Sequence, residues 1–254
     1  MEISTKLLDI LKKAKKVVVL TGAGVSAESG IATFRDPNGL WTKMNPAELA
    51  SVQGFMSNPK LVWSWYEHRR DIISSTKPNP GHYSIAEMQN IFPDFTLITQ
   101  NVDRLHQTAG SKNVIELHGN IIDNHCQKCK KPFKGEASLP DGELPKCPEC
   151  GGMIRPSVVW FGENLPFEAL SSAEEAAESC EVFFSVGTSA EVYPAAASPI
   201  KAKQCGALLI EVNPNQTALS IYADFKLEAP SGFALPILLE KLKKLDKFGI
   251  LDNS

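Results

Sequence analysis

Short apolar runs alternate with longer amphipathic stretches along most of this 254-residue chain. Six runs have the length and apolar content of buried strands, and they are residues 17–20, 95–99, 114–117, 182–186, 208–212 and 225–227. Apolar positions recur with helical spacing over residues 59–75, 82–91, 167–179 and 194–204. This alternation predicts an α/β fold, a Rossmann-like, doubly wound and mostly parallel sheet with helices on both faces.

Two stretches interrupt the alternation. Residues 37–80 contain three of the four tryptophans and no clear strand, and residues 121–157 contain four of the six cysteines. We expect the first to be a helical insert and the second a zinc-ribbon module, together forming a smaller lobe. The large domain then comprises residues 1–36, 81–120 and 158–254.

Composition and charge narrow the class of protein. Hydrophobic residues make up 43% of the chain and charged residues 22%, values ordinary for a soluble globular domain. The formal net charge of −3 gives no reason to expect a nucleic-acid or membrane surface. The first sixteen residues have helical spacing of apolar positions and lack the continuous apolar core of a secretory signal. A cytoplasmic location and a monomer are therefore the expectations.

The cysteines are paired in the sequence. Two Cys-x-x-Cys motifs, separated by 17 residues, supply Cys126, Cys129, Cys147 and Cys150. Their spacing is typical of a tetrahedral Zn²⁺ site with four thiolates, which leaves no open position and is therefore structural. A redox pair is the alternative, and two motifs so close together favour the metal. The remaining Cys180 and Cys205 have apolar neighbours and are expected to be buried thiols without chemistry.

A glycine turn follows the first predicted strand. Gly22, Ala23 and Gly24 have almost no side chain, and a strand that enters a helix through glycines brings backbone N–H groups to a phosphate. The full GxGxxG pattern would need glycine where Ala27 stands. A nucleotide ligand and a simple tight turn therefore both remain open at this motif.

Polar residues follow two later strands, at the sheet edge where α/β proteins bind ligands. Gln100, Asn101 and Asp103 offer hydrogen-bonding groups suited to a ribose and a carboxamide, and the alternative is a helix cap by Asn101 or Asp103. His118 follows the next strand, and its ordinary pKa of about 6.5 suits a general base near neutrality. A structural histidine is the alternative there.

Taken together, these segments resemble the sirtuin family of NAD-dependent protein deacylases. The matching motifs, in the family's order, are GAGVSAESGIATFR, TQNVD, LHG, the two Cys-x-x-Cys pairs, VVWFGE, VGTS and EVNPN. They cover about residues 10–245. The resemblance implies a Rossmann-type domain and a small zinc lobe, with NAD as a consumed co-substrate in the cleft between them. Asp36 departs from the pattern, because many members carry glycine after the TFR motif.

The resemblance also implies roles for matched residues. The cofactor would contact Gly22, Ala23, Gly24, Ala27, Phe34, Arg35, Trp41, Gln100, Asn101, Val102, Asp103, Gly187, Thr188, Ser189, Asn213, Pro214, Asn215 and Ser231. His118 would act as general base on the ribose hydroxyls, and Asn101 would orient a water or the ribose. The segment 158–163 would accept the substrate peptide as an added strand, with Val159 and Phe161 touching the acyl-lysine.

The acyl group is indicated by Tyr66 and Arg69. They are spaced i, i+3 on a predicted helix and share a face, where a hydroxyl and a guanidinium would clamp a carboxylate. A solvated helix surface is the alternative. In the sirtuin resemblance this pair matches the class that removes succinyl and malonyl groups.

The expected activity is therefore NAD-dependent removal of succinyl, malonyl and acetyl groups from protein or peptide lysines. Its products would be nicotinamide, O-acyl-ADP-ribose and free lysine. One alternative keeps the fold and transfers ADP-ribose to a protein side chain. Another is a non-enzymatic NAD sensor or zinc-ribbon adaptor, which the presence of His118, Asn101 and Asp103 disfavours.

Overall fold

The six predicted strands form one parallel sheet in the computed structural model, which describes residues 1–33, 45–134 and 143–248. The strands are β1 (Lys16–Thr21), β2 (Asp94–Thr99), β3 (Ile115–Glu116), β7 (Val182–Val186), β8 (Leu208–Val212) and β9 (Phe225–Leu227). Their spatial order is β3-β2-β1-β7-β8-β9. The order reverses between β1 and β7, and such a switch point opens a binding crevice at the carboxyl ends of the strands.

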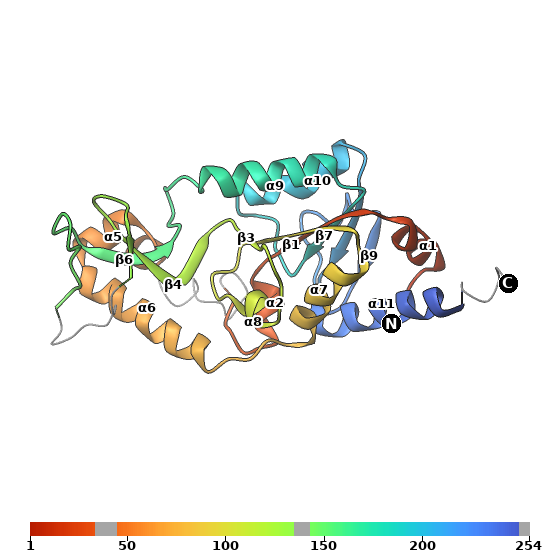
Figure 1. Ribbon diagram of the computed structural model, residues 1–254, viewed down its shortest axis with the longest axis horizontal. Coiled ribbons are helices and arrows are strands. Elements are labelled where there is room, and N and C mark those ends of the chain that lie inside the picture. Colours follow the sequence, from red (N-terminus) through yellow and green to blue (C-terminus); the bar gives the residue numbers. More distant parts are fainter. Residues whose placement is uncertain (34–44, 135–142, 249–254) are drawn as a thin grey trace.

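Helices cover both faces of this sheet (Figure 1). One face carries α1 (Thr5–Lys13), α7 (Pro80–Ile91) and α11 (Ser231–Phe248), and the other carries α9 (Phe167–Ser179) and α10 (Ser198–Gln204). In β1, Val17 and Val19 pack into the core under α1, α7 and α11. Val18 and Leu20 pack into the core on the opposite face, under α9 and α10. Residues 17–20 of the strand are all apolar because both of its faces are buried. The predicted doubly wound α/β fold is confirmed.

A small lobe extends beyond one end of the sheet (Figure 1). It contains an antiparallel sheet in the order β5-β4-β6, formed by β4 (Gly119–Cys126), β5 (Pro132–Phe133) and β6 (Ile154–Val158). Its helices are α4 (Pro46–Leu49), α5 (Val52–Ser57) and α6 (Pro59–Ser74). α6 begins at a proline, and the Asn58 side chain accepts the Leu61 N–H at 3.2 Å, which defines the helix start.

The remaining elements are short: α2 (Ala23–Ala27), α8 (Leu105–Thr108) and the 3₁₀ turn η2 (Ala195–Ala197). The helix predicted over residues 194–204 divides into η2 and α10, because Pro199 has no N–H with which to continue the helical ladder. Within the described residues, no helix is long and apolar enough to cross a membrane.

Candidate functional site

A cavity of about 1010 Å³ opens at the carboxyl ends of β1, β2, β7 and β8, and the segment after β6 closes its other side. It lies at the upper end of the size range of small-molecule sites, about 300–1,000 Å³. The predicted residues that line it are Gly22, Ala23, Gly24, Ala27, Tyr66, Gln100, Asn101, Val102, His118, Val159, Phe161, Gly187, Thr188, Ser189, Asn213, Pro214, Asn215 and Ser231. Asp103 and Arg69 are described but lie outside this lining.

The glycine turn joins two strand ends. The Gly22 N–H donates to the Val186 carbonyl at 3.1 Å, and the Gly24 N–H donates to the Gly187 carbonyl at 2.8 Å. A Cβ on Gly24 would lie 2.8 Å from that carbonyl oxygen, so a side chain here would force the strand ends apart. Both of these N–H groups are therefore committed to backbone carbonyls, and the contact of this turn with a cofactor stays a prediction.

Ser26 holds the polar residues of the β2 end in place. Its hydroxyl donates to Asp103 at 2.7 Å and accepts from the Asn101 side-chain amide at 3.2 Å. The same amide donates to the Gly22 carbonyl at 3.0 Å. Asn101 is thereby fixed at the cavity wall. Asp103 lies behind it and also accepts the N–H of Leu105, the first residue of α8, at 2.9 Å. Burial raises the pKa of Asp103.

Two buried histidines support this network, and the sequence did not indicate either one. His82 Nε2 lies 3.4 Å from the Ser26 hydroxyl, and His106 Nε2 lies 2.9 Å from that of Thr21. Burial lowers their pKa values to about 4 and about 3, so both rings are neutral at neutral pH. One signal could have found His82, because it stands three residues after the helix cap Asn79 and completes a capping box.

His118 is held by the backbone in one tautomer. Its Nδ1 lies 3.1 Å from the Gln100 carbonyl oxygen, and because a carbonyl only accepts, Nδ1 carries the proton. Nε2 is then the proton acceptor of the ring. Burial lowers the pKa of His118, which favours this neutral form. A neutral imidazole with an available nitrogen, lining a cavity, is suited to general base catalysis.

The β7 and β8 ends form the other half of the cavity. The Gln100 side chain donates to the Thr188 hydroxyl at 3.1 Å, and the Asn213 side chain donates to the Thr188 carbonyl at 3.0 Å. Thr188 therefore connects the β2 and β8 ends across β1 and β7. Asn213 also accepts the Asn215 N–H at 3.1 Å, which shapes the loop that follows.

Two carboxylates that were not among the predicted site residues stabilise this half of the cavity. Glu211, only 4% exposed, accepts the Ser220 hydroxyl at 2.5 Å and also the Thr217 hydroxyl. These two hydrogen bonds fix the loop of residues 213–220, and most of that loop lines the cavity. Glu28 accepts the Gly232 N–H at 2.8 Å and the Ser231 hydroxyl at 3.2 Å, at the start of α11.

Tyr66 lines the cavity from the small lobe and is 3% exposed. Its hydroxyl accepts the indole N–H of Trp160 at 2.7 Å. Burial raises its pKa to about 12, so the hydroxyl keeps its proton at neutral pH. Arg69, 8% exposed on the same helix, has its guanidinium carbon 5.1 Å from the Trp65 ring centroid. The alternative of a solvated helix face is therefore wrong for both residues.

The segment 158–163 is not the continuous strand edge that its sequence suggested. The strand ends at Val158, and the N–H groups of Val159 and Phe161 donate to the carbonyls of His118 and Ala50, each at 2.9 Å. The chain then turns at Gly162, whose φ of +85° a strand does not permit. Val159 and Phe161 still line the cavity, but their N–H groups are not available to an added strand.

Three predicted cofactor residues, Phe34, Arg35 and Trp41, lie outside the described residues, as does Asp36.

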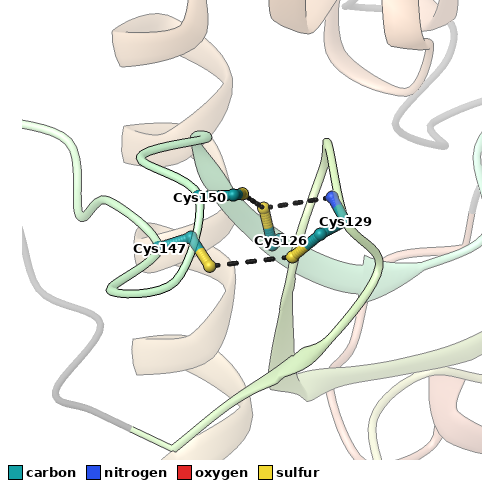
Figure 2. Close-up of side chains that lie close together, drawn as sticks. All are labelled: Cys126, Cys129, Cys147 and Cys150. Atoms are coloured by element: carbon teal, nitrogen blue, oxygen red, sulfur yellow. Dashed lines mark hydrogen bonds between the residues drawn. The ribbon is translucent and has the colours of Figure 1, made fainter.

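The four paired cysteines converge in the small lobe. Figure 2 shows their side chains turned toward one another from two facing loops. Sγ of Cys126 lies 3.5 Å from that of Cys150, and Sγ of Cys129 lies 3.7 Å from that of Cys147. Tetrahedral zinc with Zn–S bonds of about 2.3 Å separates its sulfurs by about 3.8 Å. The donor set and its spacing therefore fit a structural Zn²⁺.

The two other cysteines differ from each other. Cys180 is buried, and burial raises its pKa to about 11, as expected for an inert thiol. Cys205 is exposed, so the expectation of a buried thiol is wrong there. It follows the last residue of α10 and precedes Gly206, and this helix end lies at the surface.

The fold and site define a class of α/β protein with a ligand cavity between a Rossmann-like domain and a small four-cysteine lobe. A model of the Sir2 family matches residues 22–194. The NAD-dependent protein deacylase of Aquifex aeolicus is 54% identical, over 85% of this chain and 91% of that protein. The enzyme of the same description from Methylococcus capsulatus is 46% identical, over 96% and 99%. The chain belongs to the Sir2 family.

Solved structures agree with this assignment. A Sir2 homologue in complex with NAD superimposes with a TM-score of 0.90 at 43% identity, covering 96% of this chain and 95% of that one. A mutant Sir2 complex with a deacetylated peptide and 3′-O-acetyl-ADP-ribose gives a TM-score of 0.84 at 34% identity, covering 93% and 97%.

Proposed function

We propose that this protein removes acyl groups from lysine side chains and consumes NAD in the reaction. The observation that carries the proposal is His118, whose Nδ1 is committed to the Gln100 carbonyl and whose Nε2 is left as a base beside the cavity. Membership of the Sir2 family supports it. So do the NAD and ADP-ribose complexes of homologues that are 43% identical.

Different residues of the chain would bind different parts of the two substrates. The β7 and β8 ends, with Thr188 and Asn213, would hold the adenosine half of NAD, and Asn101 and Gln100 would face the nicotinamide ribose. His118 would take a proton from a ribose hydroxyl at its Nε2. The acyl-lysine would enter from the small-lobe side, along Val159 and Phe161.

We further propose that the acyl pocket prefers a terminal carboxylate, as in succinyl and malonyl groups. Tyr66 lines the cavity, and Arg69, which lies outside that lining, shares its face of α6. Both are buried, so a carboxylate that reached them would be shielded from solvent. The Tyr66 hydroxyl is a neutral donor, and the guanidinium stays protonated although burial lowers the pKa of Arg69. Such charge-assisted contacts are about twice as strong as neutral ones.

Nicotinamide release with NAD and acetyl-, malonyl- or succinyl-lysine peptides tests both statements. Release should require the acyl-peptide, and the double substitution Tyr66→Phe with Arg69→Met should reduce kcat/KM for the succinyl peptide about tenfold or more, because charged hydrogen bonds contribute about 1.5–3 kcal/mol. Acetyl turnover is the internal control and should be retained. An unchanged ratio of succinyl to acetyl turnover would contradict the acyl preference, and release without any peptide would contradict deacylation.

A further inference from the structure

Trp160 lies at the boundary between the cavity and the core of the small lobe. It lines the cavity, yet its side chain is only 2% exposed. Its indole Nε1 donates to the Tyr66 hydroxyl at 2.7 Å. Its ring also packs beside Phe55, with 5.3 Å between ring centroids. The indole therefore connects the core of the lobe to one side chain of the proposed acyl pocket.

An ion pair between buried Arg155 and half-buried Glu163 fixes the position of this indole. The guanidinium carbon of Arg155 lies 3.3 Å from the Trp160 ring centroid, and Arg155 is fully buried. Arg155 binds both carboxylate oxygens of Glu163, at 2.7 and 2.9 Å. Glu163 in turn accepts the backbone N–H of Trp160 at 2.9 Å. The residue is thus held at its ring face and at its backbone by the same pair of charges.

The direction of the Trp160–Tyr66 hydrogen bond has a chemical consequence. An indole N–H only donates, so the Tyr66 oxygen must accept and cannot return its own proton to Trp160. The Tyr66 O–H must therefore find an acceptor elsewhere, and Tyr66 lines the cavity. Without the indole N–H, the same hydroxyl could either donate or accept.

We propose that Trp160 is a positioning residue for acyl selectivity, which commits the Tyr66 hydroxyl to donate toward an acidic acyl group. It acts through Tyr66 and not on the reacting atoms. This inference rests on the proposed preference for succinyl and malonyl groups. It adds that the preference depends on an indole donor outside the Tyr-x-x-Arg pair.

The substitution Trp160→Phe tests the proposal, because it keeps an aromatic ring beneath Arg155 and removes the N–H donor, together with part of the ring volume. KM for the succinyl peptide should rise about threefold to tenfold, the loss expected for one hydrogen bond, with kcat and acetyl turnover within about twofold of the unsubstituted protein. In a Tyr66→Phe background the same substitution should have no further effect, because the two residues act as one unit.

Trp63→Phe is the matched control. Trp63 is a fully buried tryptophan on the same helix as Tyr66, and its Nε1 has no hydrogen-bond partner among the described residues. Removing that N–H should leave the ratio of succinyl to acetyl turnover unchanged. If Trp160→Phe lowers the melting temperature, replacement of Trp160 by 3-benzothienylalanine keeps the ring size and still removes the N–H.

The outcomes separate the two proposals. Equal losses for acetyl and succinyl peptides in Trp160→Phe, or effects of Trp160→Phe and Tyr66→Phe that simply add, would overturn the role of Trp160 and leave the acyl preference intact. If the unsubstituted protein accepts acetyl peptides and neither succinyl nor malonyl peptides, the preference itself fails, and the role of Trp160 fails with it.

Discussion

His118 has one ring nitrogen bonded to the backbone and one available to a substrate, so its activity depends on the second nitrogen being unprotonated. Burial disfavours the imidazolium and lowers the pKa of His118 from its ordinary 6.5. The neutral base is therefore present at all pH values above this lowered pKa and is lost only as the pH falls through it.

The prediction is a pH profile of kcat/KM whose acid limb lies below pH 6.5, about the value of an unperturbed histidine. It is measured with an acetyl-lysine peptide that has no other group titrating between pH 5 and 8. The acetyl group itself does not titrate, so the limb reports the enzyme. An acid limb at or above pH 6.5 would show that His118 is not the base or that its surroundings stabilise the charged form.

The residues around His118 show what the sequence could and could not predict. His118, Gln100 and Asn101 were predicted because they follow apolar runs, and the ends of strands can be recognised from such runs. Ser26 was not, because its partner Asp103 is 77 positions away and its contact with His82 spans 56. Contacts over such distances depend on the sheet order, which no local pattern specifies.

At the level of elements, the site depends on how closely the β1 and β7 ends approach each other. Gly187 has a φ of +59°, and a Cβ there would lie 2.5 Å from the Val25 nitrogen. Both conditions favour glycine, since the left-handed conformation costs other residues about 1–2 kcal/mol and overpacking costs about 1–3 kcal/mol more.

We therefore expect Gly187→Ala to lower the free energy of unfolding by about 2–5 kcal/mol and to reduce NAD-dependent turnover, because the two loops that line the cavity must separate. Gly206→Ala is the control, since Gly206 has a φ of +100° but nothing within 4 Å of its Cβ position. It should cost about 1–2 kcal/mol and leave turnover unchanged. Equal effects of the two substitutions, measured by denaturant unfolding, would show that the close approach is unimportant.

The elements themselves were largely predictable. All six strands of the large sheet were expected. The central strands β1, β7 and β8 are the clearest cases, because strands buried on both faces are continuous apolar runs. For the segment 158–163 the sirtuin resemblance implied a strand edge, and the backbone follows a different path. Its path is set by the turn at Gly162 and by the Glu163 carboxylate, which accepts the Trp160 N–H. These are tertiary interactions, and residue periodicity does not report them.

For the whole molecule, the important relation is the one between the four cysteines and the cavity. β4 begins directly after His118 and ends at Cys126, and β6 runs from Ile154, near the second cysteine pair, to Val158 at the cavity. The two strands pair antiparallel, with Gly119 opposite Val158 and Cys126 opposite Ile154. The candidate zinc site therefore closes one end of a ribbon whose other end forms part of the cavity wall.

This arrangement predicts that the metal supports activity without taking part in the chemistry. Cys147→Ser, or removal of metal by a chelator, should lower the zinc content from about one per chain, lower the melting temperature and reduce turnover, because structural zinc contributes on the order of 10 kcal/mol to folding small modules. Cys205→Ser, at an exposed thiol outside the cluster, should leave all three unchanged. Elemental analysis, thermal unfolding and nicotinamide release measure the three quantities on the same samples. Full turnover in a zinc-free protein would show that the ribbon keeps its shape without the metal and that the four thiols serve another purpose.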